Sequence, residues 1–175
     1  MTYVPLHVHS EYSLLDGLSQ TSQISKRLND IEIDTCALTD HGTVSGAVDF
    51  SKTLKNASQK QILGCEFYIC EKNATEKNQE NRNLIHQIVL AKNLQGWKDI
   101  LQLVSKANSY NQFYHKPRID FTQLRAAASH GNLISFSGHL GSYLGNIALE
   151  NRSDKFICEA AYRLQNMFGK DNFFI

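Results

Sequence analysis

The stretch Leu6-His7-Val8-His9-Ser10-Glu11 places two histidines one residue apart at the end of an apolar run. Side chains of a β-strand alternate between its two faces, so His7 and His9 leave the backbone on the same side. Two imidazoles on one side can share a metal ion, although an isolated pair of this kind is more often solvated or hydrogen bonded. By itself the pattern leaves a metal site and an ordinary polar strand end both open.

The composition is that of an ordinary globular chain. Its 175 residues are 42% hydrophobic and 20% charged, and this length suits one domain with its own core. Lys and Arg number 18 against 17 Asp and Glu, which gives a formal net charge of +1. A chain with so little net charge does not attract polyanions through its overall field, so any phosphate recognition must be local.

Cysteine usage and hydropathy favour a reduced cytoplasmic protein with no membrane partner. The cysteines form no CxxC pair, and three of them lie within or beside apolar runs, as buried thiols do. We find no export signal at the N-terminus and no apolar run near the roughly 18 residues of a membrane span.

Short β-like runs alternate with helical ones, which favours a parallel βαβ architecture. The polar segment 71–83 has no apolar periodicity, so we expect an exposed, mobile loop there. Residues 171–175 resemble a loop that enters a sixth strand, and we therefore expect residues 1–175 to be a fragment with an incomplete barrel. The expected strands are 3–9, 35–39, 61–70, 85–91 and 132–137, and the expected helices are 21–30, 45–56, 97–107, 120–129 and 154–168.

Residue types that bind metals recur at or near the ends of the expected strands. In a parallel α/β barrel the loops that follow the strands meet on one face, so these side chains can surround one pocket. A mixture of imidazole and carboxylate suits Zn, Mn or Fe and leaves room for more than one ion. The residues placed in this way are His7, His9, Asp16, Asp40, His41, Glu66, His86 and His139.

Glu66 carries the strongest single signal because it lies within the apolar run Ile62–Ile69. A carboxylate buried there is costly unless it is paired or bound to metal. The alternative is an outward-facing Glu on a half-exposed strand. Asp40 also has an alternative role, as the cap of the helix that follows it.

The remaining basic residues receive other assignments. Lys116 and Arg118 could hold a phosphate, since a guanidinium meets phosphate in a bidentate fork. A solvated charged loop is the equally weighted alternative. His115 in the same loop, and His130 before a glycine at a helix end, are expected not to bind metal.

Several segments together resemble the polymerase and histidinol phosphatase (PHP) domain. LLDG, KPRID and the GWKDILQLVS helix are similar to the PHP domains at the N-terminus of bacterial replicative DNA polymerase III alpha subunits. The similarity spans nearly the whole chain. The segments are HVHSEYSLLDG (7–17), ALTDHG (37–42), ILGCEFYI (62–69), HQIVLAKN (86–93), GWKDILQLVS (96–105), FYHKPRID (113–120) and LISFSGHLGS (133–142).

The resemblance implies a distorted (β/α)7 barrel of the TIM type that holds up to three divalent ions. Asp40 would orient a ligand histidine through the nitrogen that does not bind metal. The ligand sets that it implies are His7, His9 and Glu66 for the first ion, Glu66, His86 and His139 for the second, and Asp16 with His41 for part of the third. The catalytic residues would be His7, His9, His41 and Glu66.

Two departures from the family pattern matter. His139 stands where polymerase-type members often have Cys, a change that keeps a ligand and favours ions with nitrogen and oxygen donors. The family's last motif, an Asp-x-His that serves the first and third ions, lies beyond Ile175. We therefore expect incomplete metal binding and impaired activity in this chain.

The implied function is a metal-dependent phosphodiesterase with a 3′–5′ exonuclease or proofreading role, within a DNA-directed DNA polymerase. The implied partners are DNA and other replicase subunits. One alternative is a free-standing phosphoesterase of the histidinol phosphatase type, against which the FYHKPRID loop argues. The other is a non-catalytic structural module of the polymerase, against which the ligands from His7 to His139 argue.

Overall fold

The computed structural model describes residues 3–150 and 153–175, which form one mixed sheet with helices around it. The strands are β1 (Thr35–Leu38), β2 (Lys60–Cys70), β3 (Ile85–Ala91), β4 (Ile119–Asp120), β5 (Leu133–Phe136) and β6 (Phe173–Phe174). The helices are α1 (Thr21–Asp30), α2 (Ala47–Asn56), α3 (Leu94–Ala107), α4 (Phe121–Ala128), α5 (Tyr143–Leu149) and α6 (Asp154–Phe168), with a 3₁₀ turn η1 at Glu80–Arg82.

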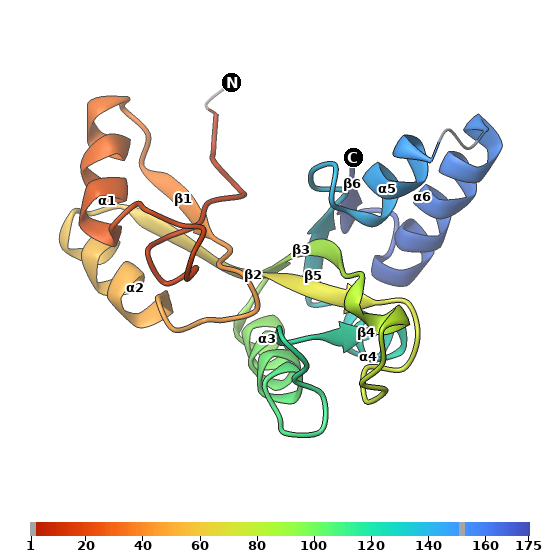
Figure 1. The fold of residues 1–175 in the computed structure, drawn as a ribbon. Helices are drawn as coiled ribbons and strands as arrows, with labels where there is room; N and C mark the ends of the chain where they lie inside the picture. The colour runs from red at the N-terminus through yellow and green to blue at the C-terminus, as the bar shows by residue number, and fades with distance from the viewer. Residues whose placement is uncertain (1–2, 151–152) are drawn as a thin grey trace.

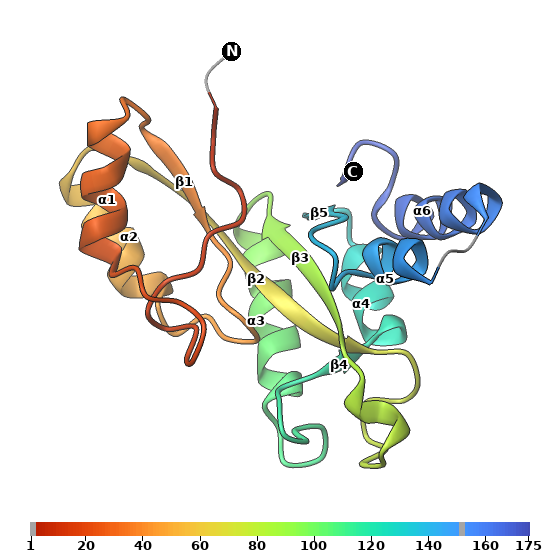
Figure 2. The ribbon, with the colours of Figure 1, turned by 45° about the horizontal axis from the view of Figure 1, so that its top comes forward.

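The strands are paired in the order β1-β2-β3-β5-β6, and β4 pairs with the end of β2. Figure 1 shows the helices on three sides of the sheet: α1 and α2 beside β1, α3 and α4 below, and α5 and α6 near β6. Figure 2 shows α3 behind β2 and β3. The helices α1 and α6 have the bounds that the sequence predicts, and β6 is the sixth strand expected near the end of the chain.

The sheet is open and mixed, so the expected parallel pairing holds for only part of it, and a (β/α)7 barrel is not confirmed. β1 and β2 run parallel, as do β5 and β6, whereas β3 is antiparallel to both β2 and β5. For β2 and β3 the reason lies in their connection, which contains no helix except η1. Parallel neighbours need a long crossover, usually a helix, and a chain that turns back without one pairs antiparallel.

Residues 3–9, expected to form a strand, lie beside β1 without forming one. Ala37 N donates a hydrogen bond to Pro5 O (2.8 Å), and Thr39 N donates to Val8 O (2.9 Å). Pro5 has no N–H and cannot donate a hydrogen bond to β1. Val8 N donates to the Thr39 hydroxyl instead of a backbone carbonyl. The segment therefore follows the edge of the sheet with a broken ladder.

Alternation along β2 and β3 separates the helix-covered face of the sheet from the face that carries the polar cluster. Phe67 and Val89 belong to the main core, which is shared with α3, α4 and α6. Glu66 lies opposite Ile88 in the β2–β3 register, and Ile88 packs in a separate small apolar cluster with Leu90. Opposed residues share a face, so Glu66 projects away from the helices α3 and α4.

Gly96 allows α3 to approach the turn before β5 closely. A Cβ at Gly96 would lie 2.1 Å from Asn132 O. We expect Gly96→Ala to lower the free energy of unfolding by about 1–3 kcal/mol, as overpacking does, because this clash outweighs the gain of roughly 1 kcal/mol from replacing a helical Gly. Urea denaturation measures the change. Gln102→Ala on the exposed side of α3 is the control, and equal midpoints for the two variants would disprove the close approach.

The cysteine thiols differ sharply in burial. Cys36, Cys65 and Cys70 are buried and Cys158 is exposed, and all four are free. Burial raises the pKa of Cys36 to about 12 and that of Cys70 to about 11. We expect an aromatic disulfide reagent at pH 8 to titrate one thiol in the folded protein and the other three only after denaturant is added. Rapid reaction of a second thiol before unfolding would contradict this burial.

Candidate metal centre

Glu66 lies at the centre of a cluster of histidines and is fully buried. Its Oε2 atom is 2.5 Å from His7 Nε2 and 2.8 Å from His9 Nε2. Its Oε1 atom is 2.7 Å from His86 Nδ1 and 2.9 Å from His139 Nε2. The two oxygens of one carboxylate therefore face two separate pairs of imidazoles.

These imidazoles determine the charge of Glu66. Burial opposes ionisation, but hydrogen bonds from the surrounding histidines more than offset it, so the pKa of Glu66 lies well below its usual range. For His9, burial lowers the pKa, and the hydrogen bond and charge of Glu66 raise it by more. The centre of the cluster is thus a fixed negative charge surrounded by nitrogen donors.

A third group of ligand atoms lies next to the first. Asp16 Oδ2 is 3.0 Å from His9 Nδ1 and 3.4 Å from His41 Nε2. Among the described residues His41 Nδ1 has no hydrogen-bond partner; it is buried, 3.9 Å from Glu66 Oε1. Burial lowers the pKa of His41 to about 4, so its imidazole is neutral at physiological pH, which is the form that binds metals.

The donor set fits divalent cations. Three overlapping groups each bring their ligand atoms within 4.8 Å of one another: His7, His9 and Glu66; His9, Asp16 and His41; and His41, Glu66 and His86. Imidazole and carboxylate donors suit Zn, Mn or Fe. A cation among them would also satisfy the unpartnered nitrogen of His41, which otherwise carries the cost of a buried polar atom.

Strand pairing brings these ligands together. Gly42 N donates to Glu66 O (2.9 Å) and Glu66 N donates to Asp40 O (3.1 Å), so the end of β1 is held against β2 next to His41. His86 N donates to Gly141 O (2.9 Å), which holds the loop of His139 against β3. Residues far apart in the sequence thereby meet at one place on the sheet.

Asp40 was expected to orient a ligand histidine, but it supports the cluster through two serines. It is buried and accepts hydrogen bonds from Ser10 N (2.7 Å), Ser10 Oγ (2.8 Å) and Ser13 Oγ (3.1 Å). Ser13 Oγ in turn lies 3.4 Å from His9 Nδ1. Within the described residues Asp40 bonds no imidazole directly, so it fixes the loop after His9 rather than a histidine ring.

The loop 13–17 aims Asp16 at the cluster. Asp16 N and Gly17 N both donate to Ser13 O (3.0 and 2.8 Å), and a Cβ on Gly17 would lie 1.8 Å from Ser10 O. Leu15 has a φ of 68°, a left-handed conformation that costs energy for a bulky residue. The turn directs the partly exposed Asp16 toward His9 and His41 and leaves the side chains of Leu14 and Leu15 exposed.

The structure overturns the expected phosphate role of Arg118, whose side chain is fully buried. Its guanidinium donates to four backbone carbonyls, those of Ala74, Gln112, Asn81 and Glu76, at 2.8–3.1 Å. These bonds leave it unavailable to a ligand. They also anchor the segment 71–83, which was expected to be a mobile loop.

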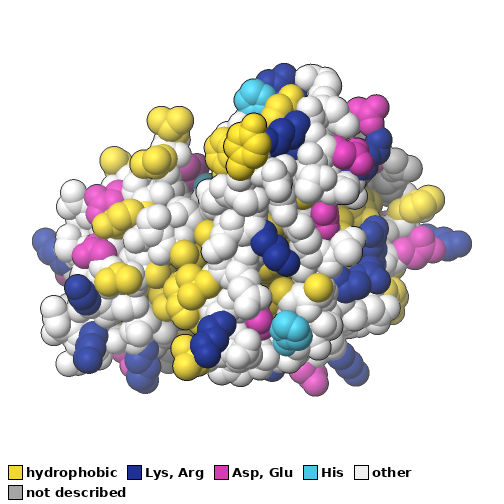
Figure 3. Space-filling model, turned by 90° about the horizontal axis from the view of Figure 1, so that it is seen from below, with side chains coloured by type: hydrophobic (Ala, Val, Ile, Leu, Met, Phe, Trp, Pro, Cys, Tyr) yellow, Lys and Arg dark blue, Asp and Glu magenta, His cyan; other side chains and the backbone are white. Residues whose placement is uncertain are grey.

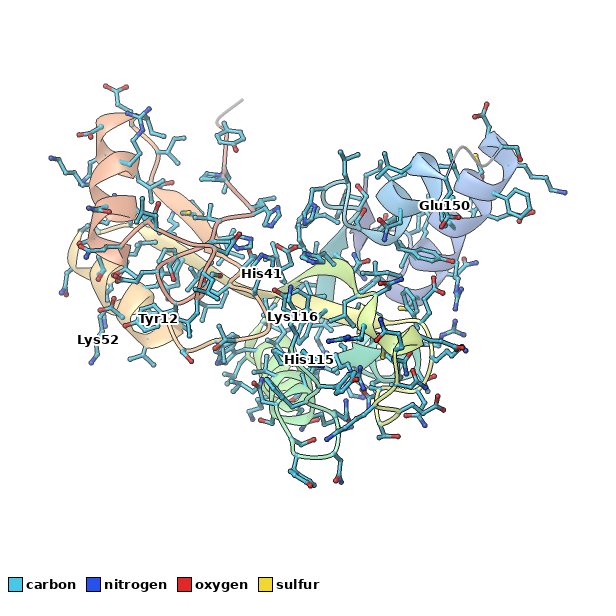
Figure 4. All side chains as sticks on the ribbon, viewed as in Figure 1. Tyr12, His41, Lys52, His115, Lys116 and Glu150 are labelled. Atoms are coloured by element: carbon cyan, nitrogen blue, oxygen red, sulfur yellow. The ribbon has the colours of Figure 1, made fainter. Side chains whose placement is uncertain are left out.

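The two histidines assigned no metal role lie outside the cluster. His115 Nε2 is 3.2 Å from Arg82 Nη2, and His130 Nδ1 is 3.1 Å from Asp99 Oδ1. Lys116 is exposed, and its Nζ atom lies 4.4 Å from the centre of the Tyr68 ring. Figure 4 shows His41, Lys116 and His115 grouped in the middle of the molecule.

Sequence reasoning missed Tyr68 and the two serines that contact Asp40. The Tyr68 ring stacks on that of His41, with centroids 5.3 Å apart and planes 13° apart. Tyr68 follows Glu66 by two residues, and that spacing in a strand could have placed it on the face of the cluster. Burial raises the pKa of its hydroxyl to about 12.

Comparison with known sequences decides the family, because a sequence model of the PHP domain matches residues 5–175. The chain belongs to the PHP domain family. It is 37% identical over its whole length to the DNA polymerase III subunit alpha of Treponema pallidum and 38% identical over 99% of its length to that of Chlamydia pneumoniae. The chain spans only 15% and 14% of those two proteins.

A structural comparison supports the fold. A structure from Bifidobacterium adolescentis, described as a metal-dependent phosphoesterase, matches 90% of this PHP chain with a TM-score of 0.51 at 12% sequence identity, and the match covers 73% of that protein. Among residues 3–150 and 153–175, no helix combines the length and hydropathy that crossing a bilayer requires.

Proposed function

We propose that the histidine cluster binds divalent metal ions and hydrolyses phosphodiesters, as a 3′–5′ exonuclease site within a cytoplasmic DNA polymerase III alpha subunit. The observation that carries the proposal is Glu66, whose two carboxylate oxygens each face a different pair of imidazoles. One carboxylate placed in this way can bridge two ions, and sites with two ions stabilise both the attacking and the leaving oxygen of phosphoryl transfer.

Each residue has a defined task in this proposal. A bound divalent ion supplies Lewis acidity, which activates water and neutralises charge on the phosphoryl oxygens. Asp40 and Ser13 keep the His9 loop in place, and Tyr68 covers His41. The proposed ligand sets are His7, His9 and Glu66 for one ion, Glu66, His86 and His139 for a second, and Asp16 with His41 for a third.

The two named relatives are DNA polymerase III alpha subunits, and this similarity supports DNA as the substrate. The proposed partners are therefore DNA and other replicase subunits. Because the chain matches only 15% and 14% of these two relatives, the role proposed for it does not include DNA synthesis. We expect the histidine cluster to act on the ends of single-stranded DNA.

The test measures metal content and DNA degradation together. We expect the purified protein to contain Zn, Mn or Fe by elemental analysis and to shorten a labelled single-stranded oligonucleotide from its 3′ end, slowly, in line with the impaired activity expected from the sequence, and a chelator should abolish this activity. His41→Gln is the control against a contaminating nuclease and should lose the activity. Bound metal without degradation would favour the non-catalytic alternative, and hydrolysis of a small phosphate monoester in preference to DNA would favour the free-standing phosphoesterase.

A further inference from the structure

Lys116 places a positive charge next to the metal-ligand cluster. Its ammonium lies over Tyr68, which stacks on His41 and contacts His86 edge to face at 4.9 Å. Leaving Glu150 aside, no Asp or Glu among the described residues forms an ion pair with it. Figure 3 shows basic and acidic side chains interspersed over the face seen from below, so local charges of this kind have to supply phosphate recognition.

The backbone around Lys116 is fixed in place. Gly42 has a φ of 60°, and a Cβ there would lie 2.5 Å from Pro117 Cγ, so glycine is needed for the loop to dock. Asn108 Nδ2 also donates to Gly42 O (3.1 Å), and the neighbouring Arg118 is buried. The loop that carries Lys116 is therefore in place before any ligand arrives, with the ammonium over the ring of Tyr68, and this lowers the entropic cost of binding.

Lys116 lines two cavities, one on each side. The cavity of about 930 Å³ reaches His41 and Tyr68 and is bounded by Tyr12, Leu14 and Leu15. The cavity of about 750 Å³ reaches His86 and is lined by both basic and acidic side chains, those of Lys72, Arg82, Glu71, Glu80 and Glu150. A small phosphate monoester needs only one such space, whereas a nucleic-acid strand continues on both sides of a bound phosphate.

The larger cavity offers an apolar wall to a base. Leu14 and Leu15 are 85% and 108% exposed, although they lie in the same loop as the cluster residue Asp16. Exposed apolar groups that a folded, hydrogen-bonded loop holds out in this way are typical of binding surfaces. Bases present a flat apolar face to side chains of this kind whatever their identity.

We propose that Lys116 binds a backbone phosphate of single-stranded nucleic acid, and that Tyr12, Leu14 and Leu15 receive the base next to it. This inference rests on the proposed function and names the substrate contacts of the same site. The positive charge selects the phosphate, the apolar wall accepts any base, and the second cavity lets the strand continue past His86.

The experiment compares Lys116→Gln, Lys116→Arg and the control Lys52→Gln, a change of an exposed lysine on α2 far from the cluster (Figure 4). Fluorescence anisotropy with a labelled single-stranded oligonucleotide, in the presence of chelator, measures binding without any hydrolysis. We expect Lys116→Gln to bind about 10-fold more weakly and to lower the slope of log affinity against log salt by about 1, as loss of one phosphate contact does. Lys116→Arg should recover most of the affinity and Lys52→Gln should match the wild type.

The base contact has its own comparison. An oligonucleotide with an abasic 3′ end should bind the wild type more weakly than the intact strand, and Leu14→Ser/Leu15→Ser should bind the two strands equally. Wild-type affinity and salt slope in Lys116→Gln, or a wild type that does not bind the oligonucleotide, would overturn the inference. If the wild type degrades DNA and Lys116→Gln binds the oligonucleotide as well as the wild type does, the inference is wrong and the proposed function stands. If binding depends on Lys116 but the wild type does not degrade DNA, the proposed function is wrong and the phosphate contact stands.

Discussion

Glu66→Gln should remove most of the bound metal from this protein. The amide that replaces the carboxylate carries no negative charge, and one of its two terminal atoms becomes a donor facing imidazole nitrogens at 2.5–2.9 Å. Loss of residues that merely orient ligands weakens metal binding about 10–100-fold, so loss of a shared ligand should exceed 100-fold or so. Elemental analysis after dialysis against a defined metal buffer measures the effect.

Two controls separate this loss from a general effect of substitution. Glu32→Gln makes the same chemical change at an exposed position, and His115→Gln removes a histidine outside the cluster. Both should retain the metal content of the wild type. If Glu66→Gln retained as much metal as either control, the assignment of Glu66 as a bridging ligand would be wrong.

Arg118→Met should destabilise the fold more than any other single change considered. The substitution leaves four buried or partly buried carbonyls without the charged donor that now serves them. Breaking a buried charged network typically costs about 3–5 kcal/mol, and we expect a loss of this size in the free energy of unfolding. Urea denaturation followed by circular dichroism measures it.

The same variant should release the segment 71–83, because Arg118 binds the carbonyls of Ala74, Glu76 and Asn81. Limited proteolysis of the folded variant should therefore cleave this segment faster than in the wild type. Lys116→Gln, two residues away and exposed, should change stability by less than about 1 kcal/mol. Equal stability of the Arg118 and Lys116 variants would show that the buried guanidinium is dispensable.

The sequence predicts the members of the histidine cluster better than it predicts the sheet. Strand alternation and strand ends depend on local pattern, so the positions of Glu66, His86 and His41 follow from their neighbours. Strand direction depends on the connections. The segment 71–83 already lacks a helical pattern, and that absence predicts the antiparallel β2–β3 pair more reliably than the overall alternation of strands and helices predicts a parallel one.

Burial limits the prediction of individual roles. Lys116 and Arg118 are both basic residues of one loop, and nothing in their local sequence distinguishes an ammonium over an aromatic ring from a guanidinium that binds four carbonyls. Asp40 likewise suits both a helix cap and a bond to a histidine, whereas it binds two serines. These differences arise from segments that meet only in the folded chain.

Gly42 ties three parts of the molecule to one backbone unit. Its N–H bonds the strand of Glu66, its carbonyl accepts from Asn108, and its missing side chain leaves room for Pro117. Through Pro117, the loop of Lys116 rests on a backbone unit that the other two contacts hold in place. If the proposed strand binds here, it meets a loop that is already in position, so its arrival and departure should not require this loop to open and close.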